Sequence, residues 1–232
     1  MPSHARLEPG SVKLLIFDLD GTLIDSRQDL VNAVNAARAH LGLPAIEDRL
    51  IASYVGDGAP VLIQRALGPQ ASQEQIQEAL QFFLDYYSRH KLDFTHPYPG
   101  VPEKLQQLAA RGLKMAVLTN KPVRISQAIL EGLSLDRFFF AVYGGNSFPH
   151  KKPHPVGVET LQSEAGVSPE ATLLVGDSAV DVRTARNAGV RVCGVTYGFQ
   201  PETLRQEPPD LLVDSFAELA DMLLAGSSAV RD

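Results

Sequence analysis

Hydrophobic positions along this chain follow two different periods. Short, continuous apolar runs are typical of strands that are buried on both faces of a sheet. Such runs cover residues 12–17, 114–118, 138–143, 171–176, 191–196 and 211–213. Between most of these runs, apolar residues recur every three or four positions, which predicts amphipathic helices. Strands that alternate with helices in this way predict a doubly wound α/β core, in which helices cover both faces of a parallel sheet.

Residues 26–92 interrupt this alternation, because their pattern is helical throughout. Four helices are predicted there, over about 26–41, 47–54, 60–67 and 72–87. Ser26, with Asp29 three residues on, is expected to cap the first of them, and Ser72 with Gln75 forms a capping box for the fourth. This stretch therefore predicts a small all-helical unit.

The positions of the breaks suggest how the units are joined. The segment 96–100 (His-Pro-Tyr-Pro-Gly) is rich in proline and glycine, as domain boundaries often are. We expect a Rossmann-like core domain formed by residues 11–24 and 97–232. A helical cap domain, residues 25–96, is inserted into it. Residues 1–10 are expected to form a leader outside both domains.

Composition narrows the class of protein. With 232 residues and 44% hydrophobic content, the chain can form a substantial core. Its net charge of -6 argues against nonspecific nucleic-acid binding, which requires a basic surface. The single cysteine, Cys193, rules out an intrachain disulfide and is expected to be a buried, inert thiol. There is no signal peptide or membrane-length apolar run, so we expect a cytoplasmic protein without membrane contact.

The most informative stretch is the first apolar run, Val12 to Phe17, which leads directly into two acids. Asp18 and Asp20 lie one residue apart, and Gly21 follows at once. Asp and Gly are ordinary turn residues, so a plain turn is one interpretation. However, two carboxylates this close at the end of a buried strand repel each other unless a cation lies between them. Mg²⁺, which prefers oxygen ligands, is such a cation.

Polar residues follow the other strands as well. They are Thr119, Asn120 and Lys121 after run 114–118, Lys151 and Lys152 beyond run 138–143, and Asp177, Ser178 and Asp181 after run 171–176. In open parallel sheets the ligands bind outside the carboxyl ends of the strands, so these side chains are expected to meet at one edge. Each residue taken alone has an ordinary explanation as a cap or a solvated charge. Together they predict a site in which acids bind Mg²⁺ while Lys152 and Thr119 bind a phosphate.

This arrangement suggests a reaction. An aspartate can attack phosphorus and form an aspartyl-phosphate, and Asp18 is the better-placed nucleophile. Asp20 then suits general acid-base catalysis, and Lys152 offsets the charge of the nucleophile and the phosphate. No Gly-x-x-x-x-Gly-Lys-Ser/Thr loop is present, so a P-loop nucleotidase is not supported.

Four segments resemble, in order, the four motifs of the haloacid dehalogenase-like superfamily. They are Asp18-Leu-Asp-Gly-Thr22, Leu118-Thr-Asn120, Lys152-Pro-His-Pro155 and Gly176-Asp-Ser-Ala-Val-Asp181. The insertion matches the helical cap that follows the first motif in one subgroup. Dehalogenases need no acid at the position of Asp20, so this residue favours phosphoryl transfer.

The resemblance implies a role for each motif residue. Asp18 would be the nucleophile and a metal ligand. Asp20 would be the acid-base residue and a ligand through its carbonyl. Thr119 and Asn120 would hold the phosphoryl group, with Lys152 as the neutralising cation. Asp177 would bind Mg²⁺ directly, and Asp181 through water or from further out.

Within the superfamily, residues 54–67 resemble the cap of phosphoglycolate phosphatases. The resemblance implies a Mg²⁺-dependent hydrolase of 2-phosphoglycolate. Gly56 and Gly58 are candidate contacts of a small anion, although a plain turn between helices explains them equally well. Arg65 is the candidate cation for the substrate carboxylate, and Gly21 is also counted among the substrate-binding residues.

Other functions stay open at this point. The same core would serve a sugar-phosphate phosphatase, a pyrophosphatase or a phosphomutase. A non-catalytic phospho-receiver domain is a more distant alternative, because such domains lack an inserted helical unit. The expected partner is a small phosphorylated metabolite, and the sequence leaves the oligomeric state undetermined.

Overall fold

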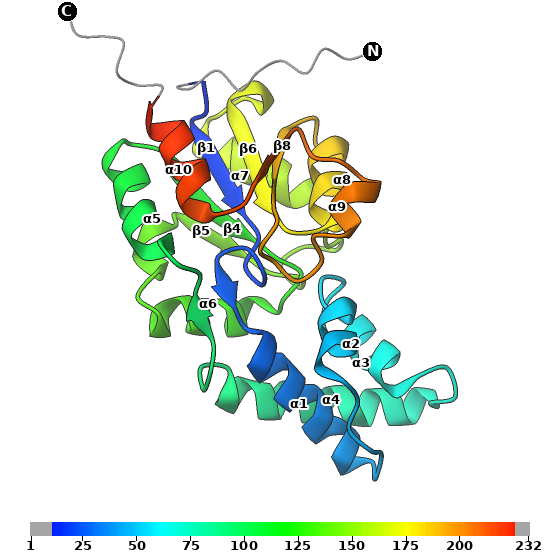
Figure 1. Cartoon of the computed structure of the whole chain (residues 1–232). Helices are drawn as coiled ribbons and strands as arrows, with labels where there is room; N and C mark the ends of the chain where they lie inside the picture. Colours follow the sequence, from blue (N-terminus) through cyan, green and yellow to red (C-terminus); the bar gives the residue numbers. More distant parts are fainter. Residues whose placement is uncertain (1–10, 226–232) are drawn as a thin grey trace, which may run out of the picture.

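A computed structural model describes residues 11–225 of the chain, so the predicted leader, residues 1–10, lies outside the described residues. Six parallel strands form one sheet in the order β5-β4-β1-β6-β7-β8 (Figure 1). Their bounds are β1 Leu14–Phe17, β4 Lys114–Leu118, β5 Ala141–Tyr143, β6 Thr172–Gly176, β7 Arg191–Val195 and β8 Leu211–Val213. The predicted Rossmann-like α/β core is confirmed. β1 lies between β4 and β6, which explains why its apolar run is continuous.

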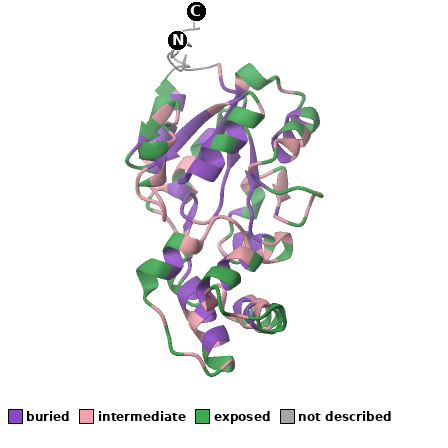
Figure 2. Ribbon diagram, turned by 90° about the vertical axis from the view of Figure 1, so that its right-hand side faces the viewer, coloured by how far each residue is buried: buried purple, intermediate pink, exposed green. Residues whose placement is uncertain are grey.

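Helices cover both faces of this sheet. They are α5 (Val101–Ala110), α6 (Val123–Gly132), α7 (Val156–Ala165), α8 (Ala179–Asn187), the short α9 (Thr203–Gln206) and α10 (Phe216–Ala225). Leu15 and Phe17 of β1 belong to the cluster that α5, α6 and α10 contribute to. Leu14 and Ile16 belong to the other cluster, with α7 and α8. The sheet is accordingly buried on both sides, whereas the outer helix faces are exposed (Figure 2).

The predicted inserted unit consists of four helices, called the cap from here on. They are α1 (Arg27–His40), α2 (Asp48–Tyr54), α3 (Ala59–Leu67) and α4 (Gln73–His90). Helices α1 and α4 pack along each other, and the cap lies beside the end of the sheet to which the strands point (Figure 1). The predicted Ser72–Gln75 capping box is present. Gln75 N–H donates to Ser72 Oγ at 3.3 Å, and Ser72 N–H donates to Gln75 Oε1 at 2.9 Å.

The connection between the two units contains a strand pair that the sequence did not predict. Two short strands, β2 (Ile24–Asp25) and β3 (His96–Pro97), pair antiparallel where the chain enters and leaves the cap. The predicted boundaries at 25 and 96 fall within this pair. Strands of two residues have no periodicity that a sequence pattern can reveal.

The predicted cap of α1 by Ser26 with Asp29 is wrong. The Ser26 hydroxyl makes no capping bond and donates instead to Asp20 Oδ1 at 2.5 Å. Asp29 is buried and accepts hydrogen bonds from the backbone N–H groups of Phe94 and Thr95 and from the Thr95 hydroxyl. Tertiary partners thus replace the local ones, and Asp29 joins the start of α1 to the segment that leaves the cap.

The predicted strand over 138–143 is shorter than expected. A 3₁₀ turn occupies Asp136–Phe138, and β5 begins only at Ala141. An apolar run does not distinguish a strand from a packed turn, because both bury their side chains.

Candidate active site

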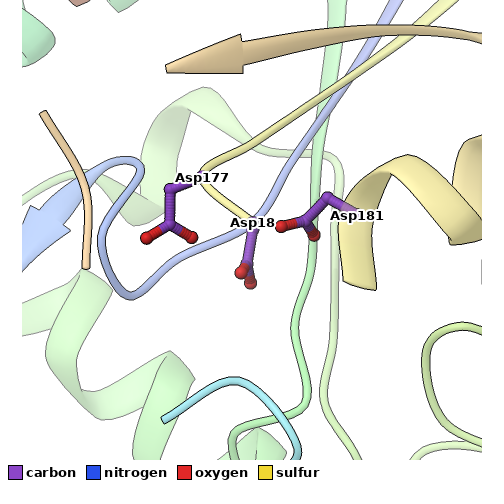
Figure 3. Close-up of side chains that lie close together, drawn as sticks. All are labelled: Asp18, Asp177 and Asp181. Atoms are coloured by element: carbon purple, nitrogen blue, oxygen red, sulfur yellow. The ribbon is translucent and has the colours of Figure 1, made fainter. Parts of the chain in front are cut away.

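The loops that follow β1, β4 and β6 meet at one edge of the sheet, because these strands are neighbours and parallel. Asp18 follows β1, Asp177 follows β6, and Asp181 lies in the first turn of α8. Figure 3 shows their carboxylates directed toward the same space. One oxygen from each lies within 4.8 Å of the others, and all three side chains are buried.

Burial and mutual repulsion raise the pKa values of two of these acids. The pKa of Asp177 is raised to about 8, first by burial and then by the nearby Asp181 and Asp18. The pKa of Asp18 is raised to about 6 by burial, although the Lys152 ammonium opposes that rise. A carboxylate is charged more easily when a cation is close. The cluster therefore needs more positive charge than the described side chains provide.

Lys152 is the cation that the fold places within this cluster. Its ammonium group lies 3.0 Å from Asp18 Oδ1 and 2.6 Å from Asp181 Oδ1, and its side chain is 2% exposed. Burial alone would lower the pKa of Lys152, but the two carboxylates outweigh it and leave that pKa raised. Lys152 thus stays charged and holds Asp18 and Asp181 at a fixed spacing.

Two glycines and two backbone amides determine the position of Asp177. A Cβ atom at Gly21 or Gly198 would collide with the Asp177 carboxylate, and Gly21 also has a φ of +79°. The backbone N–H groups of Phe199 and Gln200 donate to Asp177 Oδ2, at 2.5 and 3.4 Å. The loop after β1 and the loop after β7 can therefore close on this acid only where they carry glycine.

Asp20 is surrounded differently from the three clustered acids. Lys121 Nζ donates to both of its carboxylate oxygens, at 2.9 and 3.0 Å, and to the Tyr87 hydroxyl of α4 at 2.6 Å. Ser26 adds the bond to Oδ1 described above. The two acids of the first loop thus have separate cations, Lys152 for Asp18 and Lys121 for Asp20.

Thr119 and Asn120 follow β4 and are buried. The Asn120 amide group donates to Gly56 O in the cap at 2.8 Å and to Lys152 O at 3.0 Å. The Asn120 Oδ1 atom is buried without a hydrogen-bond partner among the described residues. Asn120 therefore joins the cap to the loop that carries Lys152.

Residues 53–58, called the cap loop from here on, cover the carboxylates. Gln200 Nε2 donates to Ser53 O at 2.8 Å and to Val55 O at 2.6 Å, and Lys151 Nζ donates to Asp57 O. Gly58, with a φ of +86°, approaches Asn120 so closely that an added Cβ would lie 3.1 Å from Asn120 O. The core thus binds the cap loop through its backbone carbonyl groups.

Core and cap together line a partly open cavity of about 50 Å³. The polar residues lining it include Asp18, Asp20, Thr119, Asn120, Lys121 and Asp177, and the glycines include Gly56 and Gly58. Leu62 and Phe83 line its cap side with apolar surface. Arg65 does not line this cavity. It forms an ion pair of 2.7 Å with Asp57 and is 42% exposed.

Two residues of this site received no role from the sequence. Lys121 was placed at this edge of the sheet, because it follows a strand, but its pairing with Asp20 was not predicted. Tyr87 was assigned to the apolar stripe of the fourth helix, because a tyrosine in such a stripe has the same spacing as any core residue. Only the packing of α4 against the core brings its hydroxyl to Lys121.

Comparison with known proteins identifies the family. The model of the haloacid dehalogenase-like hydrolases matches residues 15–195, which include the loops after β1, β4 and β6 and the whole cap. The chain belongs to this family. Among its relatives, the phosphoglycolate phosphatase of Vibrio vulnificus is 38% identical over 223 residues, covering 93% of this chain and 98% of that protein.

Further relatives agree with this assignment. The phosphoglycolate phosphatase of Pseudomonas syringae pv. tomato is 40% identical over 212 residues, covering 89% of this chain and 78% of that protein. A crystal structure described as a predicted phosphoglycolate phosphatase from Haemophilus somnus superimposes with a TM-score of 0.86 at 36% identity. It covers 93% of this chain and 98% of that chain, so the similarity to this member of the dehalogenase-like hydrolases includes the cap.

The carboxylate cluster fits the divalent metal that phosphatases of this family generally use. Three buried oxygen donors lie within reach of one ion, and two of the carboxylates have raised pKa values in the absence of further positive charge. Hard divalent cations prefer such oxygen ligands. Within residues 11–225, no helix is long and apolar enough to cross a membrane.

Proposed function

We propose that this protein is a Mg²⁺-dependent phosphatase that hydrolyses 2-phosphoglycolate to glycolate and phosphate. The observation that carries the proposal is the cavity between core and cap, where Asp18, Asp20 and Asp177 meet beside the cap loop. Relatives named phosphoglycolate phosphatase match both the core and the cap of this chain, which supports the choice of substrate.

In the first step, Asp18 attacks the phosphorus atom and forms an aspartyl-phosphate. The bond between phosphorus and the glycolate oxygen breaks, and Asp20 donates a proton to that oxygen. The ion pair of Lys152 with Asp18 supports this assignment, because it orients the attacking carboxylate. Asp20 pairs with Lys121 and makes no ion pair with Lys152, so its carboxylate suits proton transfer.

In the second step, water attacks the phosphorus atom and gives a proton to Asp20. The bond between phosphorus and Asp18 breaks, which releases phosphate and restores the enzyme. Thr119 and the backbone amide of Asn120, in the loop after β4, hold the phosphoryl oxygens, and Gly21 is the candidate contact from the loop after β1. Lys152 offsets their charge.

Mg²⁺ would be held by Asp18, Asp177 and the carbonyl of Asp20, with Asp181 behind them. When bound, the ion supplies positive charge that lets the carboxylates and the phosphoryl group approach one another. The protein contributes the spacing of these groups through Lys152 and through the glycines that pack on Asp177.

The cap would select a small substrate. A cavity of about 50 Å³ bordered by the cap loop favours a small phosphate ester, and Gly56 and Gly58 let the loop approach closely. Arg65 has no part in this proposal, because it lies outside the cavity and is paired with Asp57.

A panel of phosphate esters tests the function. We expect kcat/KM for 2-phosphoglycolate to exceed that for sugar phosphates and for pyrophosphate by at least about tenfold. Such a ratio corresponds to the loss of one substrate contact in the transition state. The measurement is the rate of phosphate release with Mg²⁺. A preference for a sugar phosphate, or return of the phosphoryl group to a sugar, would replace this proposal by a sugar phosphatase or a mutase.

Replacing the nucleophile tests the mechanism. Asp18→Asn is expected to lower kcat by more than about 1,000-fold, because an amide cannot form the aspartyl-phosphate. Asp136→Asn changes an exposed acid in the 3₁₀ turn that precedes β5, which lines no part of the cavity, and is expected to retain the wild-type rate. Near-normal turnover by Asp18→Asn would contradict the mechanism.

A further inference from the structure

Lys121 is a buried lysine that carries none of the roles assigned above. Its side chain is 4% exposed, and its ammonium group has three partners within 3.0 Å. Two are the oxygens of Asp20 and the third is the Tyr87 hydroxyl. An ammonium group has three N–H donors, so these contacts satisfy all of them. Within the described residues, it is the one basic side chain that lines the cavity between core and cap.

These contacts join the core to the cap. Asp20 and Lys121 belong to the loops after β1 and β4, whereas Tyr87 lies on α4, the longest helix of the cap. The Tyr87 ring stacks on Phe83 with centroids 5.6 Å apart, and Lys121 Nζ also lies 4.5 Å from the centroid of the Tyr87 ring. The position of the Tyr87 hydroxyl therefore follows the position of α4.

We propose that Lys121 is a positioning residue for the general acid-base Asp20, and that Tyr87 makes this positioning depend on the cap. Lys121 holds both oxygens of Asp20, so the carboxylate cannot rotate toward the cluster around Lys152. Tyr87 in turn holds Lys121 from the cap side. The acid-base group thus has its catalytic orientation when α4 lies against the core. This inference rests on the phosphatase function proposed above.

The alternative role for Lys121 is direct recognition of the substrate carboxylate. The geometry favours positioning, because the donors of Lys121 are already engaged by protein atoms. The two roles differ in kinetics. A lost substrate contact raises KM, whereas a misplaced acid-base group lowers kcat at nearly constant KM.

The first test is Lys121→Met, which keeps the length of the side chain and removes its donors. We expect kcat for 2-phosphoglycolate to fall by about 10- to 100-fold, within the range that general acid-base catalysis contributes, while KM changes less than about twofold. Lys104→Met is the matched control, since Lys104 pairs with Asp221 on a partly exposed surface of the core. It should show wild-type kinetics.

The second readout is the phospho-enzyme, which a merely structural defect would not enrich. Acetyl phosphate releases acetate, which needs no proton from Asp20 to leave. Acetyl phosphate should therefore still phosphorylate Asp18 in the Lys121→Met variant. Hydrolysis of the resulting aspartyl-phosphate should be slow, because that step needs Asp20 as a base. Mass spectrometry after acid quenching should show a larger phosphorylated fraction than in the wild type. With 2-phosphoglycolate, whose leaving oxygen needs the proton, that fraction should not rise.

Tyr87→Phe tests the dependence on the cap and removes a single oxygen atom. Like Lys121→Met, it should lower kcat at nearly constant KM, but by only about threefold to tenfold, because Lys121 loses one of its three partners. The double variant should be no slower than Lys121→Met alone, since Tyr87 acts through Lys121. Circular dichroism melts verify folding, and Tyr87→Phe carries the test if Lys121→Met does not fold.

Two failures can be told apart. If the wild type does not hydrolyse 2-phosphoglycolate, the proposed substrate is wrong, but the acetyl phosphate experiment still tests Lys121. A folded Lys121→Met with wild-type kcat, or with a raised KM alone, would overturn the positioning role. Additive losses in the double variant would overturn the link through Tyr87.

Discussion

Asp18 and Asp177 show how the environment of a residue sets its chemistry. Both acids end buried strands, and both have raised pKa values because burial and neighbouring acids oppose their charge. Asp20 lies two residues from Asp18 but pairs with Lys121 rather than Lys152. Two acids of the same type in one short loop therefore have different partners and are suited to different steps.

Asp177 leads to a prediction about stability and pH. Its folded pKa of about 8 lies above the ordinary aspartate pKa of 3.8, so between these pH values the folded state holds a proton that the unfolded state has released. Without metal, the contribution of Asp177 to the free energy of unfolding should be fully present below pH 4 and be lost as pH rises to 8. Asp177→Asn should then be more stable than the wild type at pH 8, with a smaller difference at pH 5.

The measurement is thermal unfolding of both proteins in a chelator at several pH values. The difference between the two proteins is the relevant quantity, because other titrating groups cancel in it. A constant difference across this range would show that Asp177 is already charged in the folded protein.

At the scale of elements, the cap loop is bound by groups of the core that follow different strands. Asn120 follows β4, and Gln200 lies in the loop after β7. Both donate to backbone carbonyl groups of residues 53–58, so the cap loop can vary in side chain without losing these bonds. This arrangement explains how a loop on a separate helical unit closes a cavity in the core.

Gln200→Ala should loosen this closure. Removing two hydrogen bonds, each with a net value of about 0.5–1.5 kcal/mol, should raise KM for 2-phosphoglycolate by at least about fivefold. The change in kcat should be smaller, because the reacting groups of the core remain in place. Gln206→Ala, an exposed glutamine on α9, serves as the control and should keep the wild-type KM. An unchanged KM in Gln200→Ala would show that these bonds do not limit closure.

At the scale of the whole molecule, the acid cluster joins parts of the chain that are distant in sequence. Asp18 and Asp177 are brought together only because β1 and β6 pair. Their repulsion acts against the folded state, and a divalent ion between them should stabilise the whole core. A ligand that binds only the folded protein at 100 times its Kd adds about 2.7 kcal/mol.

Mg²⁺ should accordingly raise the midpoint of thermal unfolding by about 5–10 °C at that excess, since each kcal/mol shifts a protein of this size by about 2–4 °C. Asp177→Asn should lose most of this shift, and Asp136→Asn should retain it. Equal shifts in all three proteins would place the ion elsewhere.

The sequence by itself determined the core fold, the helical nature of the insertion and the loops that hold the acids. Apolar periodicity reports burial, and parallel strands bring their carboxyl ends to one edge whatever their exact order. Only the tertiary structure decided the partners of individual side chains. Ser26 and Asp29 form tertiary hydrogen bonds instead of capping a helix. Arg65 pairs with Asp57 outside the cavity. Tyr87 of the cap accepts a hydrogen bond from Lys121 of the core. These contacts depend on how the helices pack against the sheet, and the spacing of residues along the sequence does not report that packing.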